Sequence, residues 1–256
     1  VTVNTNVTQG SGDLVYNSSY TQTAGTFTPS AGVLDFNSQF TLTGGVFNAP
    51  SGVVTFASDF TINGGTFNAG SGTVVFDTGA STVDVATTQS FNNLTFNTPG
   101  TFKVVGGGDV LVVNGTLTLT AGQVVNGTVN ALGNVVLAST FGGGNTTLLI
   151  SGNAVRTFTL PAGAGVPVLT VNAPNVTVNT SGSGSITFQQ PVTWQSTAGV
   201  TNGAVSCTFN STVTVNTNVT QGSGDLVYNS SYTQSGGTFT PSAGVLDYNS
   251  AFTLSG

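Results

Sequence analysis

The chain has 256 residues, a net charge of −6, and only two basic side chains, Lys103 and Arg156. With eight aspartates, no glutamate and no histidine, it lacks the basic surface of a nucleic-acid binder and the residues of the usual hydrolytic triads and zinc sites. Polar residues interrupt every apolar run well short of the about 20 residues that a membrane-spanning helix needs.

The beginning of the chain returns at its end. Residues 1–44 reappear as residues 213–256, so that Val1 corresponds to Val213, with differences at only five positions. We expect residues 1–212 to be one complete long repeat and residues 213–256 to be the start of the next one, within a tandem array. The register between the two copies favours a polypeptide that runs on in the same pattern.

A shorter period, of about 20 residues, lies within the segment 20–79. Each of its three repeats should be one coil with about three short strands, separated by Gly, Asn, Ser or Pro corners. Stacked coils would bring like residues together in buried ladders, at the strand spacing of about 4.8 Å. The aromatic ladders expected are Tyr20, Phe40, Phe60; Phe27, Phe47, Phe67; and Phe36, Phe56, Phe76.

From residue 80 to residue 212 the pattern continues less regularly, and no stretch has the spacing of a helix. Glycine-rich segments at 106–108 and 142–144 are expected to be corners. The sequence predicts strands at 82–85, 94–97, 110–113, 116–120, 135–137, 147–150, 157–160, 168–171, 176–179, 186–188 and 192–194. The predicted fold is therefore an all-β parallel β-helix (β-solenoid) with about 20 residues per coil.

Asparagines recur at the corners of the predicted coils. Asn17 aligns with Asn37, and Asn48 aligns with Asn68. A side-chain amide can donate to the equivalent amide one coil away, so we expect two asparagine ladders at these corners.

No catalytic site and no metal site are predicted, and no cofactor is expected. The spacing of four aspartates, Asp13, Asp35, Asp59 and Asp77, is uneven, so they drift between columns. Neither Lys103 nor Arg156 has an acidic cluster near it in sequence. The calcium-binding pattern of some solenoids occurs only once, at residues 106–109, without the required periodicity. We therefore do not expect an enzyme.

Cys207 is the only cysteine. One interpretation is a small buried hydrophobic residue, and the other is a disulfide to a neighbouring filament. Asn-x-Ser/Thr triplets, such as those that begin at Asn6, Asn114 and Asn175, permit glycosylation only in a host that has the machinery.

The segments FTLTGGVFNAPSGVVTF, FNNLTFN, NGTLTLTAG and RTFTLPAG resemble the giant repetitive β-solenoid surface proteins and adhesins of bacteria. The resemblance covers nearly the whole chain and concerns the style of the repeat. It implies a right-handed parallel β-helix, secretion, and an extracellular or cell-surface role in adhesion or matrix building.

Two functions fit these expectations. The first is a structural extracellular filament, sheath or biofilm-matrix fibre that forms by end-to-end stacking of coils, with other copies of itself as partner. The second is the stalk of a large secreted adhesin. A more remote alternative is a face that binds carbohydrate, including surface glycans, or ice. The threonine row that ice binding needs breaks at once, because Thr26 and Thr28 align with Val46 and Asn48.

Overall fold

The computed structural model describes the chain except residues 31, 174–175, 182–184, 196–199, 202–203 and 256. The described residues form two compact units, Val1–Val129 and Asn130–Gly256. Their strands pair in parallel, and no helix occurs among them. The fold is therefore the predicted β-solenoid. The boundary between the units is not the boundary between the long repeats, which remain a prediction from the sequence.

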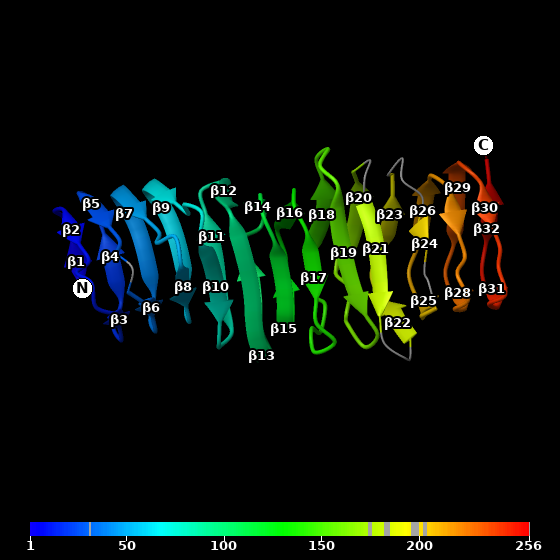
Figure 1. The fold of residues 1–256 in the computed structure, drawn as a ribbon, viewed down its shortest axis with the longest axis horizontal. Helices are drawn as coiled ribbons and strands as arrows, with labels where there is room; N and C mark the ends of the chain where they lie inside the picture. Colours follow the sequence, from blue (N-terminus) through cyan, green and yellow to red (C-terminus); the bar gives the residue numbers. More distant parts are fainter. Residues whose placement is uncertain (31, 174–175, 182–184, 196–199, 202–203, 256) are drawn as a thin grey trace. The chain divides into compact units, whose positions relative to one another are not determined.

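Unit 1 consists of coils whose strands lie side by side along the blue-to-green part of Figure 1. β7, β9 and β13 are long because each continues through a corner, where its register shifts and a glycine takes a positive φ angle. The strands that pair in one column are β1 (Thr2–Val3), β4 (Tyr20–Gln22), β7 (Phe40–Asn48), β9 (Phe60–Asn68), β11 (Ser81–Val85) and β13 (Asn93–Val105). A second column holds β3 (Leu14–Tyr16), β6 (Leu34–Phe36), β8 (Val53–Phe56) and β10 (Thr73–Asp77). β13 pairs with β10 on one side and with β15 (Leu117–Val125) on the other. Of the remaining strands, β2 (Val7–Thr8) pairs with β5 (Thr26–Thr28), and β5 pairs with the second half of β7. β12 (Thr88–Phe91) pairs with β14 (Val110–Val113). β16 (Thr128–Ala131) contains the boundary between the units.

The corner inside β7 shows why a glycine recurs in each of the first coils. Gly25, Gly45 and Gly65 have φ angles of 73°, 76° and 71°, which L side chains rarely adopt. A Cβ atom at Gly45 would also clash with the carbonyl oxygen of Gly25 in the preceding coil. Glycine is therefore required both by the backbone angle and by the close approach of stacked corners.

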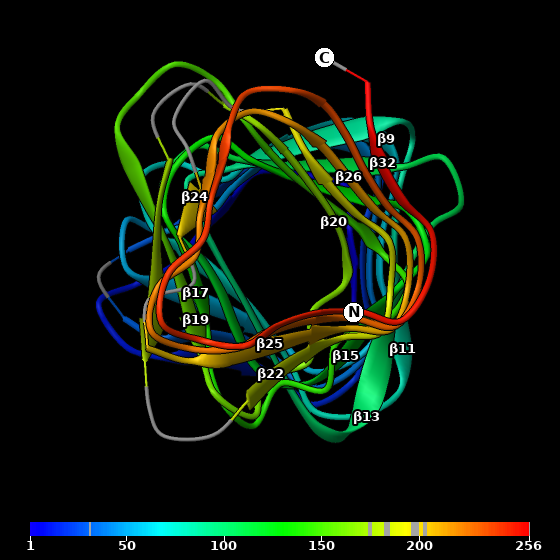
Figure 2. The ribbon, with the colours of Figure 1, turned by 90° about the vertical axis from the view of Figure 1, so that its right-hand side faces the viewer.

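Unit 2 has the same construction, and Figure 2 looks along its later coils, which overlay one another in yellow to red. One column contains β18 (Thr147–Ser151), β20 (Val168–Asn172), β23 (Val192–Trp194), β26 (Val213–Asn216), β29 (Tyr232–Gly236) and β32 (Phe252–Leu254). The other columns contain β17 (Val135–Leu137), β19 (Arg156–Pro161) and β21 (Val176–Ser181); β22 (Ser185–Phe188), β25 (Ser206–Phe209), β28 (Leu226–Tyr228) and β31 (Leu246–Tyr248); and β24 (Val200–Thr201), β27 (Val219–Thr220) and β30 (Phe239–Thr240).

The strands predicted after residue 80 all overlap observed ones, and those at 110–113, 135–137 and 192–194 have the observed bounds. The prediction missed the short β24, and it missed β12, β16 and β25, whose sequences TQSF, TVNA and SCTF are poor in aliphatic β-branched residues. It also ended the strand at 94–97 too early. The observed β13 continues past Pro99 and Gly100 to Val105.

Candidate functional site

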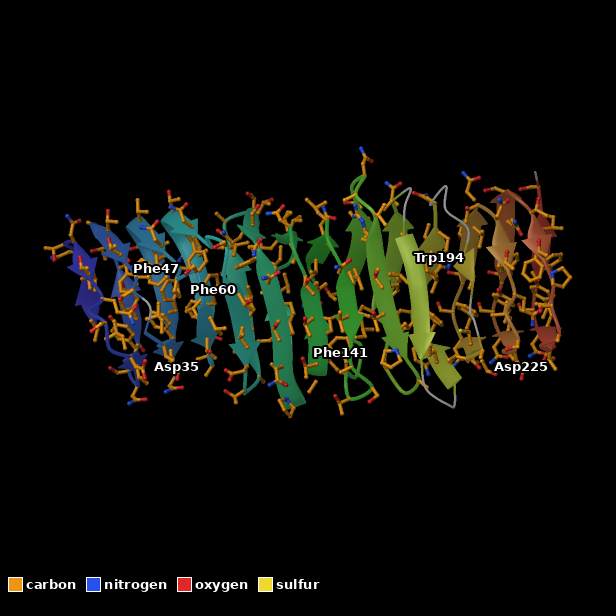
Figure 3. All side chains as sticks on the ribbon, viewed as in Figure 1. Asp35, Phe47, Phe60, Phe141, Trp194 and Asp225 are labelled. Carbon is orange, nitrogen blue, oxygen red and sulfur yellow. The ribbon has the colours of Figure 1, made fainter. Side chains whose placement is uncertain are left out.

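Each predicted aromatic ladder is a column of buried rings in unit 1. Phe27 and Phe47 stack with ring centroids 4.6 Å apart and an interplanar angle of 7°, and Phe47 stacks on Phe67 at 5.4 Å. The Tyr20–Phe40 and Phe40–Phe60 pairs stack at 5.4 and 5.2 Å. These contacts come from the registers that pair equivalent positions of successive coils. Figure 3 labels Phe47 and Phe60 among the interior side chains of this unit.

The third ladder loosens where the regular short period ends. Phe36 and Phe56 stack at 5.0 Å and 8°, whereas Phe56 and Phe76 are 5.9 Å apart and tilted by 39°. The ladders also contact one another edge to face, as Phe40 and Phe47 do at 5.0 Å and 80°. Such pairs contribute about 0.5–1.5 kcal/mol each beyond the burial of their surface.

Both predicted asparagine ladders have the expected hydrogen bonds. Asn37 Nδ2 donates to Asn17 Oδ1 at 2.9 Å, and Asn68 Nδ2 donates to Asn48 Oδ1 at 2.8 Å. The first ladder ends at Ala57, whose backbone N–H still donates to the Phe36 carbonyl oxygen. In unit 2 a longer ladder was not predicted. There Asn249 donates to Asn229 at 2.9 Å and Asn229 to Asn210 at 2.8 Å.

Buried glutamines were not predicted, and each of the two on inward strand faces, Gln22 and Gln234, stands in a column of apolar residues. Gln22 is fully buried, accepts a hydrogen bond from the Tyr20 hydroxyl at 2.9 Å, and donates to the carbonyl oxygens of Gly25 and Val46. All of its polar atoms are therefore satisfied inside an apolar core. The signal was present in the sequence, because Gln22 lies two residues after Tyr20 and therefore on the same, inward face of the strand.

Three aspartates join neighbouring coils by accepting backbone N–H groups. Asp13 Oδ1 accepts the backbone N–H of Val33 at 2.8 Å, Asp59 Oδ1 that of Thr82 at 2.8 Å, and Asp109 Oδ2 that of Val85 at 2.9 Å. Each bond joins one coil to its neighbour. Among the described residues, no group of three or more Asp or Cys side chains is placed to hold a metal ion.

Lys103 has no acidic cluster near it in sequence, but stacking of the coils brings Asp77 and Asp59 close to it. Its side chain is fully buried, and its Nζ lies 6.0 Å from the centre of the Phe76 ring. Burial lowers the pKa of Lys103 to about 8, although the nearby carboxylates of Asp77 and Asp59 act to raise it. Burial, with Asp35 nearby, raises the pKa of Asp77, whose Oδ1 is buried without a hydrogen-bond partner.

The Lys103 ammonium group connects three successive coils. Nζ donates to the Ser81 hydroxyl, and it lies 3.5 Å from the carbonyl oxygen of Ser58. An amine beside a hydroxyl can transfer a proton, but a fully buried one offers no surface to a substrate. The geometry therefore assigns Lys103 to the support of this corner.

Arg156 is the second buried cation, and it supports the turn before β19. Its Nε donates to the Ala154 carbonyl oxygen at 3.0 Å and its Nη1 to that of Ser151. Nη2 is buried without a partner in the structure. Desolvation lowers the pKa of the Arg156 guanidinium group.

Cys207 is a free, buried residue with 4% of its surface exposed. Burial raises the pKa of its thiol to about 12, so the reactive thiolate is suppressed at neutral pH. The interpretation as a small buried hydrophobic residue is confirmed, and a disulfide to a neighbouring filament does not fit this position.

Outward-facing threonines form rows that were not predicted. In unit 1 the registers align Thr2, Thr21, Thr41 and Thr61, and in unit 2 they align Thr170, Thr193, Thr214, Thr233 and Thr253. Beside the first row, the Thr23 and Thr43 hydroxyls donate to backbone carbonyl oxygens of the preceding coil. A double row of free hydroxyl groups, as expected of an ice-binding face, is thus not formed by these residues.

Within the described residues, no helix is long and apolar enough to cross a membrane. Comparisons with protein-family models, with curated proteins and with solved structures found no match to this chain.

Proposed function

We propose that the chain is the repeating shaft of a structural filament, sheath or matrix fibre outside the cell, with other copies of itself as its main partner. The observation that carries this proposal is the use of the polar side chains. The asparagine amides, the aspartate carboxylates and the buried ammonium group of Lys103 all bind groups of a neighbouring coil. A protein whose polar side chains bind along the stacking direction is suited to bear load along its axis.

The packing supports the same function. Backbone hydrogen bonds, aromatic stacks and amide ladders all join each coil to the next, so a longer array gains stability with each coil added. With charged residues at only 4% of the chain, its stability should depend weakly on salt. The extracellular location rests on the resemblance to bacterial surface proteins.

Immunogold electron microscopy of intact cells tests the location and the filament together. An antibody raised against this chain should place gold along filaments outside the cell. Label at one fixed distance from the surface, in single copies, would support an adhesin stalk instead. Label found only inside cells would contradict both.

Self-association is tested with the purified chain. Sedimentation velocity should show growth with concentration, and fibre diffraction should give an axial reflection near about 4.8 Å. Leu254→Lys places a charge on an exposed apolar residue of the last strand and should abolish growth. Val155→Lys is the matched control, since Val155 is also exposed but lies outside the strands, and it should leave growth unchanged. A chain that stays monomeric at all concentrations would exclude stacking of separate copies.

A further inference from the structure

The coil length changes in the middle of unit 1. Up to β9 most registers advance by 20 residues, as in Phe47 paired with Phe67 (67 − 47, or 20). Beyond β9 the step is longer in two columns, where Phe60 pairs with Val83 (83 − 60, or 23) and Thr88 with Val110 (110 − 88, or 22), whereas β10 still pairs with β13 at a step of 20. Among the described residues, β12 pairs with β14 and has no ladder pairing with the end of β9. The longer coil therefore interrupts the column of paired strands between β9 and β12 (Figure 1).

A hollow of about 260 Å³ lies at this interruption. We call it the amide notch and define it by the side chains of Asn68, Gln89, Ser90, Asn92 and Asn114 around its mouth. Apolar atoms of Phe67, Ala69 and Phe91 also line it. Asn68, Ser90 and Asn114 are exposed, so the notch is open to a ligand from solvent.

In each of the four amides of the notch, the NH₂ group donates a hydrogen bond to an oxygen atom of the protein. Gln89 Nε2 donates to the carbonyl oxygens of Phe67 and Ser90, at 3.1 and 2.8 Å. The Asn92 amide donates to the Ser71 carbonyl oxygen at 2.6 Å, the Asn114 amide to that of Phe91 at 3.2 Å, and the Asn68 amide to Asn48 Oδ1.

Their side-chain oxygen atoms are the remaining hydrogen-bonding groups. No described residue donates to the side-chain oxygens of Asn68, Gln89, Asn92 or Asn114. Four neutral amides thus line the notch, and the orientation of each is fixed because its NH₂ group is held. Fixed acceptors lose little conformational entropy when a ligand binds.

We propose that the amide notch binds one neutral sugar residue of a glycan. A sugar ring carries several hydroxyl donors that can bind the amide oxygens. A divalent cation or an ammonium group favours carboxylates, and none lines the notch. The site goes beyond the proposed structural role, because it would let a filament hold a polysaccharide at intervals along its length.

Solution NMR on the isotope-labelled full chain tests the site. The probes are cellopentaose, maltopentaose and mannopentaose, each titrated to about 10 mM. At least one should shift the side-chain amide signals of Gln89 and Asn92 saturably. Calcium chloride alone, as a separate titration, should not shift them.

Two variants test the same residues. Asn68→Ala/Asn114→Ala removes two acceptors and should weaken binding about tenfold. Ser90→Phe keeps all four amides but fills the hollow, and should abolish binding. The matched control is Asn17→Ala/Asn37→Ala, which removes two ladder amides of the same unit away from the notch and should bind as the unchanged chain does.

The proposal is overturned if none of the three sugars gives a saturable shift, or if the Ser90→Phe variant binds as tightly as the unchanged chain. A saturable shift with calcium alone would make the notch a cation site and would also overturn it. None of these results bears on filament formation, which sedimentation measures separately.

Discussion

Residues 1–44 and 213–256 are nearly the same sequence, yet their side chains are buried to different extents. Phe40 and Leu42 are fully buried, whereas the equivalent Phe252 and Leu254 are 45% and 60% exposed. The difference follows from the neighbours, because β9 stacks on β7, while β32 has a described strand on one side only. The inward direction of a side chain is thus set by its own coil, and its burial by the next one.

At the first coils the difference in burial is reversed, because there the residues of the first copy are the more exposed ones. Leu226 and Tyr228 are each 3% exposed, between β25 and β31, but the equivalent Leu14 and Tyr16 are only half-buried, because β3 pairs with β6 alone. The burial of equivalent side chains therefore depends on whether a coil lies on both sides of them.

Some contacts that lie within one copy recur in the other, although the glutamine amide of each copy donates to different carbonyl oxygens. The Tyr20–Gln22 bond of 2.9 Å corresponds to Tyr232–Gln234 at 2.8 Å. Thr23 is replaced by Ser235, and both hydroxyls donate to the backbone of the preceding coil, so the substitution keeps the hydrogen bond. The comparison separates what one copy contains from what its neighbours add.

The largest expected effect tests the contribution of the neighbours. Phe40→Ala should cost about 3–5 kcal/mol of unfolding free energy, because it empties a site enclosed by stacked rings. Phe252→Ala, at the equivalent position, should cost less than about 1 kcal/mol. Hydrogen exchange should show the Phe40→Ala loss within a few coils of β7. Equal costs, or uniform loosening along the chain, would mean that burial by neighbouring coils does not control stability.

The next effect tests what each copy contains. Gln22→Ala should cost about 3 kcal/mol, since it removes three buried hydrogen bonds and leaves the Tyr20 hydroxyl without its partner, although the Gly25 carbonyl oxygen keeps the backbone N–H of Val46. Gln234→Ala removes the same number of bonds and should cost the same within about 0.5 kcal/mol. Denaturant titration of both variants measures this. A much smaller loss for Gln234→Ala would show that this contact also depends on the surrounding coils.

A smaller effect concerns Lys103, which neither copy contains. Its pKa is about 8 in the folded chain and near 10.5 in the unfolded chain, so between these pH values only the unfolded state binds the proton. Unfolding free energy should therefore rise with pH across this window, by up to about 2 kcal/mol after allowance for solvent screening.

The measurement is the difference in stability between the unchanged chain and Lys103→Met, followed from pH 7 to pH 11. The subtraction removes the opposing contribution of Cys207, whose raised pKa lowers stability above about pH 9. A difference that stays constant across this range would show that the Lys103 ammonium group is not desolvated.

The smallest effect returns to the two copies. Among the described residues, Asn17 takes part in one ladder bond, from Asn37, whereas the equivalent Asn229 takes part in two, with Asn210 and Asn249. Asn17→Ala should cost about 0.5–1 kcal/mol and Asn229→Ala about twice as much. Thermal unfolding of the two variants measures the ratio. A ratio of one would show that exposed ladder bonds add no stability.

Much of the fold could be predicted from the sequence because the relevant signals are local or strictly periodic. The alternation in FTL and FTI sets which side chains face inward, and the constant spacing of Phe27, Phe47 and Phe67 sets which of them stack. The same reasoning found the asparagine ladders. It missed Gln22 because a polar side chain on an inward face was not expected in the core.

The tertiary structure alone decided what occurs where the period changes. Lys103 lies 22 residues from Ser81 and 45 from Ser58, separations that match no constant repeat, so only the observed registers bring the three residues together. The amide notch has the same origin, because a longer coil cannot pair fully with a shorter one. The sequence by itself determined the direction of each side chain through the period of two within strands. Which residues stack above and below a given side chain depends on the number of residues in every intervening corner. The corner residues show too weak a pattern for that number to be predicted from the sequence.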